Sequence, residues 1–169
     1  MESARQIVVQ SVVGASYFTC QSPWACISIV TEAGTWPKLS DEHRVGLLQL
    51  AFADIGNASG NEPGAFTEEH ARRILDFVKA MWDSIEVLMV HCEEGNSRSP
   101  AVAAAISRLY FGDDRLYFLP HMYWPNRYVY GLLLAVARKR DEFRESGDGQ
   151  VVEPPRQHRR LSKPPDDIF

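Results

Sequence analysis

The chain has 169 residues, 45% of them hydrophobic and 24% charged, which is typical of one globular domain and not of a disordered or fibrous protein. Its 18 basic and 22 acidic residues give a net charge of -4, so no overall positive field attracts nucleic acid or an anionic membrane. No apolar run approaches the roughly 18 residues of a membrane span, and the first residues do not resemble a signal peptide. We expect a soluble, cytoplasmic protein with neither nucleic acid nor membrane as partner.

The three cysteines are Cys20, Cys26 and Cys92. An odd number without the close spacing of metal ligands argues against a disulfide framework and against a zinc site. We therefore expect a reducing compartment, no metal and no other cofactor. A protective disulfide between Cys92 and one of the other two cysteines is the alternative.

Short apolar and β-branched runs in the first third of the chain predict three strands, at residues 7–9, 25–30 and 47–52. Residues 55–66 contain three glycines, two asparagines and a proline, which predicts a long loop. Thr67 then suits the N-cap of a helix, with Glu68 and Glu69 at its positive end. The apolar face expected of this helix is Ala71, Ile74, Leu75, Val78 and Trp82.

The apolar run 87–90, followed directly by His91 and Cys92, predicts a central parallel strand buried on both faces. A helix of small residues follows at 100–110, with Pro100 in its first turn. A last helix is expected at about 126–143, with Asn126 as its cap or as a brace for the preceding loop. Its buried stripe is expected to be Val129, Leu132, Leu133 and Val136.

This alternation of strands and helices predicts a three-layer α/β sandwich with a mainly parallel central sheet. We assign residues 1–145 to one domain and residues 146–169 to a polar, proline-rich tail, whose basic stretch 156–163 we interpret as solvated. Ligands of such sheets bind beyond the carboxyl ends of the strands. The end of the strand at 87–90 should therefore carry the site.

The segment from His91 to Ser99 joins the most buried strand to the most buried helix. A loop in this position aims backbone N–H groups at one point, where the helix dipole also favours an anion. Gly95 permits torsions that a Cβ would resist, and Arg98 can place a fork of N–H donors on a phosphoryl group. We expect Cys92 to be a thiolate, supported by hydrogen bonds from His91 and Ser99.

At these residues the sequence resembles the cysteine-dependent protein tyrosine and dual-specificity phosphatase superfamily, whose signature is His-Cys-x5-Arg-Ser. His91, Cys92, Arg98 and Ser99 match that signature. The order of the segments around it is similar to that of small bacterial members, and the resemblance covers roughly residues 5 to 144.

The resemblance implies a phosphomonoester hydrolase in which Cys92 is the nucleophile, Arg98 the phosphate clamp, and Ser99 and His91 assist. It also implies a general acid upstream of the cysteine, for which Asp54 is the first candidate. Glu62, Glu68 and Glu69 are the reserve candidates. The substrate would be a phosphorylated protein or a small phosphomonoester, and phosphate or sulfate could occupy the loop. The loop residues expected to bind the phosphoryl group are Glu93, Glu94, Gly95, Asn96, Ser97 and Arg98.

Glu93 and Glu94 stand side by side in this loop. Relatives that act on phosphoinositides carry lysine there, so two carboxylates favour a substrate with a single phosphoryl group over a polyphosphorylated one. Glu94 could also accept hydrogen bonds from the amides of the loop.

Two other functions use similar residues. One is a catalytically inactive module that binds phosphoproteins or anions, and the other is a rhodanese-type sulfurtransferase, which also has a cysteine loop ending in arginine. Ser99 and Asp54 favour the phosphatase. His70 and His121 have no partner at catalytic spacing. The aromatic residues are interpreted as core and rim packing, not as a nucleic-acid platform; they are Tyr117, Phe118, Tyr123, Trp124 and Tyr128.

Overall fold

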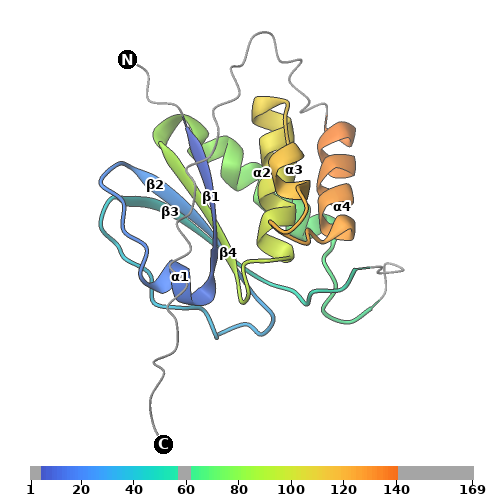
Figure 1. Cartoon of the computed structure of the whole chain (residues 1–169), viewed down its shortest axis with the longest axis horizontal. Helices are drawn as coiled ribbons and strands as arrows, with labels where there is room; N and C mark the ends of the chain where they lie inside the picture. Colours follow the sequence, from blue (N-terminus) through green and yellow to red (C-terminus); the bar gives the residue numbers. More distant parts are fainter. Residues whose placement is uncertain (1–4, 57–61, 141–169) are drawn as a thin grey trace, which may run out of the picture.

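The computed structural model describes residues 5–56 and 62–140, which form a four-stranded parallel sheet covered by helices (Figure 1). The strands are β1 (Gln6–Ser11), β2 (Trp24–Val30), β3 (Arg44–Ala51) and β4 (Val87–Cys92), in the order β1-β4-β2-β3. The helices are α1 (Val12–Ser16), α2 (Glu68–Met81), α3 (Arg98–Phe111) and α4 (Arg127–Lys139), with short 3-10 helices η1 (Trp82–Ser84) and η2 (Arg115–Phe118). The predicted α/β class with a parallel sheet is confirmed.

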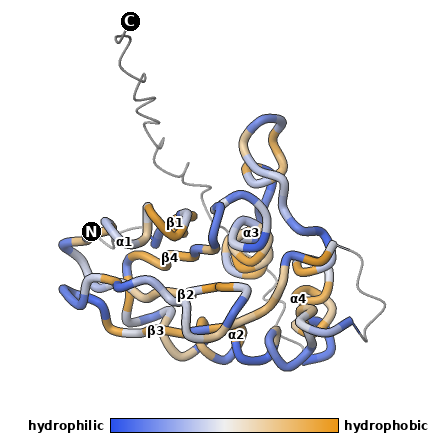
Figure 2. Tube along the Cα trace, turned by 90° about the horizontal axis from the view of Figure 1, so that it is seen from below, coloured by the Kyte–Doolittle hydropathy of each residue, from blue (hydrophilic) through white to orange (hydrophobic). Residues whose placement is uncertain are grey.

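The two faces of the sheet are covered unequally. Helices α2, α3 and α4 lie on one side and the short α1 on the other (Figure 2). Side chains alternate along β2, so Ile27 and Ile29 join the large core under the three helices, whereas Trp24 and Cys26 join a small second cluster with Ala15 and Leu39. The third layer of the expected sandwich is therefore thin, formed by α1 and the segment that carries Leu39.

Helix α2 begins at a capping box. The Thr67 hydroxyl accepts from the backbone N–H of His70 at 3.3 Å, and His70 Nδ1 accepts from the Thr67 N–H at 3.1 Å. His70 is thus a capping residue, a role that the sequence analysis did not give it. All five apolar residues expected on the buried face of this helix are buried: Ala71, Ile74, Leu75, Val78 and Trp82.

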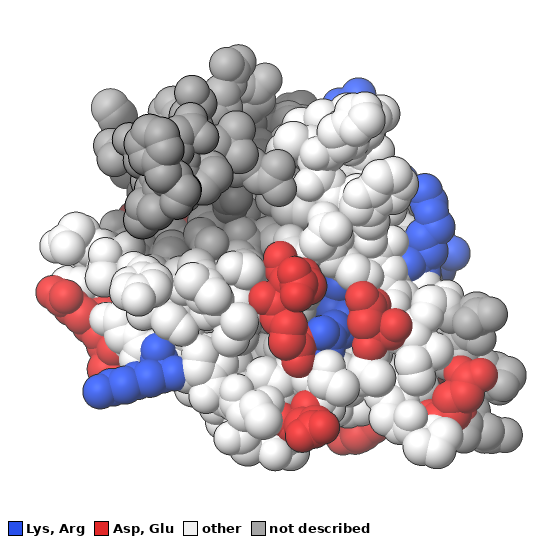
Figure 3. Space-filling model, turned by 60° about the horizontal axis from the view of Figure 1, so that its bottom comes forward, with Lys and Arg blue, Asp and Glu red and all other residues white. Residues whose placement is uncertain are grey.

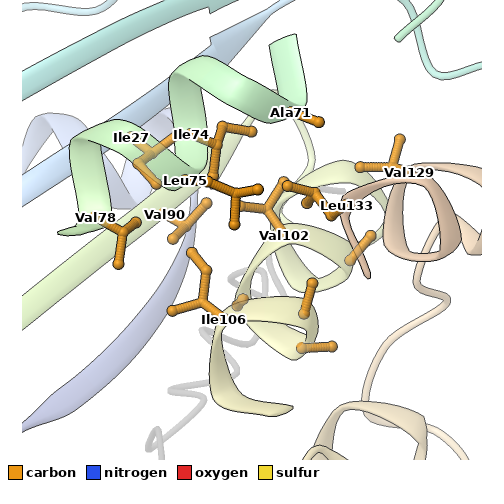
Figure 4. Packing of buried hydrophobic residues seen from close by; sticks show 14 of the residues in the cluster. Ile27, Ala71, Ile74, Leu75, Val78, Val90, Val102, Ile106, Val129 and Leu133 are labelled. Atoms are coloured by element: carbon orange, nitrogen blue, oxygen red, sulfur yellow. The ribbon is translucent and has the colours of Figure 1, made fainter. Parts of the chain in front are cut away.

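Helix α3 is the central helix of its layer, and nearly every one of its residues is buried. Val102 and Ile106 meet side chains of α2, α4 and the sheet in one continuous core (Figure 4). Small residues make this possible because they let α3 approach its neighbours closely. Gly112, at φ 75°, ends the helix in the left-handed conformation. The amino end of α3 is consequently held rigidly at the end of β4.

Helix α4 differs from expectation in two respects. Its cap is Asn126, as predicted, with Oδ1 accepting from the Val129 N–H at 3.0 Å. Leu132, however, is only partly buried, and Leu134 is buried instead, because α4 packs against both α2 and α3 and needs a wider apolar face. The helix ends at Lys139 and not at residue 143. Residues 141–143 and the expected tail at 146–169 lie outside the described residues.

None of the helices in the described part of the chain combines the length and the hydrophobicity that crossing a lipid bilayer requires.

Candidate active site

Cys92 is the last residue of β4, and its side chain is buried where the strand turns toward α3. The Gly95 N–H donates a hydrogen bond to Cys92 Sγ at 3.2 Å, and Ser99 Oγ lies 3.2 Å from the same sulfur. Ser99 belongs to the first turn of α3, so the positive end of the helix dipole is directed at this group. The sulfur therefore lies between a backbone N–H donor, a hydroxyl group and the amino end of a helix.

Gly95 is fixed by its conformation and by its surroundings. Its φ is +68°, a left-handed value that side chains with a Cβ rarely adopt. A Cβ at this position would lie 2.6 Å from the backbone nitrogen of Ser11 and 2.7 Å from the carbonyl carbon of Gln10. The backbone of the loop is also joined to the start of α1, directly after β1, since the Val12 N–H donates to the Glu93 carbonyl at 3.0 Å. The loop from Cys92 to Arg98 therefore adopts this conformation without strain only if residue 95 is glycine.

We expect Gly95→Ala to lower the free energy of unfolding by roughly 1–3 kcal/mol, because backbone and not a flexible side chain blocks the new methyl group. Urea denaturation measures this change. The control is Gly131→Ala in α4, where a Cβ meets no atom within 4 Å and should stabilise the helix by up to about 1 kcal/mol. Equal stability of Gly95→Ala and the unaltered protein would show that the loop does not need this conformation.

Arg98 is only 5% exposed and is held by groups at the ends of two neighbouring strands. Nη1 donates to Thr31 Oγ1 at 3.0 Å and to the Phe52 carbonyl oxygen at 2.8 Å. Nη2 pairs with the Glu93 carboxylate. Nε is buried and has no hydrogen-bond partner among the described residues. A buried N–H donor without an acceptor is costly, so this edge of the guanidinium is suited to an oxyanion.

Glu93 connects Arg98 to the end of β2. Its Oε1 accepts from the Thr31 N–H at 2.6 Å, while Oε2 pairs with Arg98. Partial burial alone would raise the pKa of Glu93, but the backbone hydrogen bond from Thr31 and the charge of Arg98 outweigh it and hold that pKa below its usual value. Of the two neighbouring glutamates, Glu93 is therefore the one whose carboxylate accepts a hydrogen bond from a backbone amide. Glu94, to which the sequence analysis gave that role, is exposed and makes no side-chain hydrogen bond with a described residue.

Asp54 lies just after the end of β3, and its carboxylate contacts the loop at Ser97. Its Oδ1 accepts from Ser97 Oγ at 2.9 Å and from Asn126 Nδ2 at 2.7 Å. Asn126 thus does both things that the sequence left open, since it caps α4 and braces the site. Of the reserve candidates for the acid, Glu68 pairs with Arg72 and Lys139 on the surface of α2, which is a structural role.

His91 does not contact the sulfur in the way that the sequence suggested. Its ring is fully buried, and Nε2 lies 2.7 Å from Ser28 Oγ on β2, the residue that faces it across the parallel strands. Burial lowers the pKa of His91, so the ring is neutral at pH 7. His91 therefore ties β4 to β2 beneath the loop, and Ser99 is the side chain that contacts Cys92.

The backbone of the segment before α4 completes the loop. The carbonyl of Asn96 accepts from the Trp124 N–H at 2.9 Å, and that of Ser97 accepts from the Asn126 N–H at 3.1 Å. Sequence reasoning missed Trp124 here, and it missed Thr31 and Phe52 near Arg98. One signal was available for the last two, because both directly follow strands whose carboxyl ends must meet at this edge.

All three cysteines are free. Cys26 is buried on the opposite face of the sheet, and burial raises the pKa of its thiol to about 12. The structure therefore has no disulfide between Cys92 and Cys20 or Cys26. Among residues 5–56 and 62–140, no group of three or more His, Cys, Asp or Glu side chains could hold a metal ion.

No protein-family model and no curated protein matches this sequence. Several solved structures are similar in fold. Human DUSP28 has a TM-score of 0.58 at 16% identity, over 82% of this chain and 96% of its own. The human tyrosine phosphatase-like serine/threonine/tyrosine-interacting protein has a TM-score of 0.56 at 20% identity, over 79% of this chain and 92% of its own. A mouse putative dual specificity phosphatase complexed with zinc tungstate has a TM-score of 0.51 at 17% identity, over 75% and 78%.

This chain has the phosphatase fold.

In the phosphatase fold of this chain, the loop from Cys92 to Arg98 opens at the end of the molecule where β4 leads into α3. Figure 3 views the molecule from that end and shows acidic side chains on both sides of a recessed basic one. Arg98 is buried in the structure, whereas Asp54 and Glu94 are exposed. Exposed carboxylates at this end of the molecule disfavour the approach of ligands that carry several phosphoryl groups.

Proposed function

We propose that the protein is a cysteine-dependent phosphomonoester hydrolase that acts on phosphorylated proteins or small phosphomonoesters. The observation that carries the proposal is the environment of Cys92 and Arg98. The sulfur accepts a hydrogen bond from the Gly95 N–H at the amino end of α3, and the Nε donor of Arg98 is buried without a partner beside the same loop. This combination of a nucleophile and an unsatisfied donor suits a tetrahedral oxyanion.

In the first step, the Cys92 sulfur attacks phosphorus while the bond from phosphorus to the ester oxygen breaks. The carboxylic acid of Asp54 gives its proton to the departing oxygen, so an alcohol leaves and a cysteinyl phosphate remains. The guanidinium of Arg98 and the amides of the loop hold the equatorial oxygens.

In the second step, water attacks the cysteinyl phosphate, and the Asp54 carboxylate accepts the proton that the water loses. The sulfur departs as a thiolate, stabilised by the Gly95 N–H and by the Ser99 hydroxyl at 3.2 Å. Inorganic phosphate and the original enzyme result. A fold neighbour, the mouse putative dual specificity phosphatase, forms a complex with zinc tungstate, which supports the binding of an oxyanion by a protein of this fold.

We expect the protein to hydrolyse p-nitrophenyl phosphate in the presence of EDTA, and Asp54→Asn to slow kcat by about 10²- to 10⁴-fold while phosphate inhibits both proteins equally. The amide preserves an acceptor for Ser97 and Asn126, which limits the structural change. Steady-state kinetics with phosphate as competitive inhibitor measures both quantities.

The matched control is Asp113→Asn, which alters an aspartate paired with Arg115 outside the loop and should leave kcat unchanged. Phosphate binding with no hydrolysis by either protein would instead identify an anion-binding module. Turnover of thiosulfate without release of phosphate from an ester would identify a sulfurtransferase.

A further inference from the structure

A hollow of about 710 Å³ adjoins the phosphate loop on the side of Asp54. Asp54, Gly56 and Ser97 line it on one side. Its outer wall is formed by residues of the segment between Phe118 and Arg127, among them Leu119 and Trp124. Its size lies within the range of about 300–1,000 Å³ that is usual for sites that bind small organic ligands. The hollow is therefore large enough for an organic group of more than one ring.

The outer wall of the hollow is anchored to the loop. The hydrogen bonds from the Trp124 N–H to Asn96 and from the Asn126 N–H to Ser97 connect it to two successive loop residues. Phe118 packs edge-on against Tyr130 at 5.2 Å between ring centroids, and the guanidinium of Arg127 lies 5.2 Å from the centre of the Phe118 ring. The wall is thus formed before any ligand binds and keeps a fixed position relative to Cys92.

Large apolar side chains are exposed along this wall. Trp124 is 72% exposed and Leu119 is 44% exposed, and both line the hollow. Of the aromatic residues expected in core and rim packing, Tyr117 is buried in the core and Trp124 lies exposed at the surface. Clustered exposed apolar side chains beside a site are typical of a surface that binds a ligand.

The chemistry of the proposed reaction indicates what that ligand is. Asp54 must reach the ester oxygen that leaves, so the organic group attached to that oxygen extends past Asp54, and Asp54 is part of the wall of the hollow. We propose that the hollow binds the organic part of the phosphomonoester, and that it selects an extended, flat and apolar group that stacks on Trp124. This inference rests on the proposed function and adds the class of substrate.

The test compares kcat/KM for 2-naphthyl phosphate with kcat/KM for acetyl phosphate, which has no group to fill the hollow. Trp124→Ala should lower the ratio of the two values by about tenfold, the upper range for loss of an aromatic contact. Trp124→Phe should restore most of the ratio. Tyr17→Ala, which removes an 83% exposed aromatic side chain on the surface outside the hollow, should leave the ratio unchanged.

Two phosphotyrosine peptides, with tryptophan or serine next to the phosphorylated residue, distinguish the source of the flat apolar group. Loss of discrimination between the peptides in Trp124→Ala assigns the hollow to a neighbouring side chain, and an effect on naphthyl phosphate assigns it to the leaving group; either result supports the inference. An active Trp124→Ala variant with neither effect would overturn it and leave the proposed function intact. Absence of hydrolysis of every ester would overturn the proposed function, and this inference with it.

Discussion

Cys92→Ser should reduce the hydrolysis of p-nitrophenyl phosphate by at least about 10⁴-fold, to the background rate, because removal of a catalytic nucleophile has effects of this size or larger. A serine hydroxyl at this position keeps the shape of the side chain but is protonated at neutral pH and is a much weaker nucleophile. The Gly95 N–H and Arg98 remain, so the affinity for inorganic phosphate should be preserved. Steady-state kinetics and calorimetric titration with phosphate measure the two properties.

Cys20→Ser is the control for this variant, because Cys20 is a free, partly exposed thiol that packs against the second cluster on the other face of the sheet. It should keep full activity. If Cys92→Ser retained more than a small fraction of the activity while Cys20→Ser behaved normally, another group would have to be the nucleophile.

Arg98→Lys should lower kcat/KM by about 10³-fold or more, because removal of a single preorganised donor at such a site already costs about 10²- to 10³-fold. Lysine keeps the positive charge but lacks the planar fork, so it cannot serve Thr31, the Phe52 carbonyl and Glu93 together and still present a donor to phosphate. The affinity for phosphate should fall as well, in contrast to Cys92→Ser.

Arg73→Lys is the control, because it also replaces a guanidinium group by an ammonium group of the same charge. Arg73 makes an exposed hydrogen bond to the Gln49 carbonyl on β3. This substitution should leave kcat/KM unchanged. Activity of Arg98→Lys within tenfold of the unaltered protein would mean that charge alone is sufficient and that the fork has no part in binding phosphate.

The loop from His91 to Ser99 could be predicted because its information is local in the sequence. An apolar strand, a glycine, an arginine and a proline-started helix follow one another within a few residues, and each has a specific conformational consequence. Capping of α2 by Thr67 and of α4 by Asn126 was predictable for the same reason, since a cap depends on the next three residues.

The partners of the site residues could not be predicted, because they come from other strands and loops. Thr31 and Phe52 meet Arg98 only after the sheet places β2 beside β4 and β3 beside β2. Their positions directly after strands show at which edge they lie, but no sequence spacing encodes the contact with Arg98. The pairing of Glu93 with Arg98, rather than a free carboxylate at the mouth, depends on the exact turn that Gly95 permits. Exposure of Trp124 likewise depends on how the segment before α4 folds back onto the loop.

The most direct test of the account is to trap the covalent intermediate. The protein is mixed with p-nitrophenyl phosphate, quenched within milliseconds, digested and examined by mass spectrometry. A single phosphoryl group bound through sulfur to the peptide that contains Cys92, and absent from Cys92→Ser, is the result that we predict. Rapid hydrolysis with Cys92 unmodified at every quench time would contradict the assignment of this cysteine as the nucleophile.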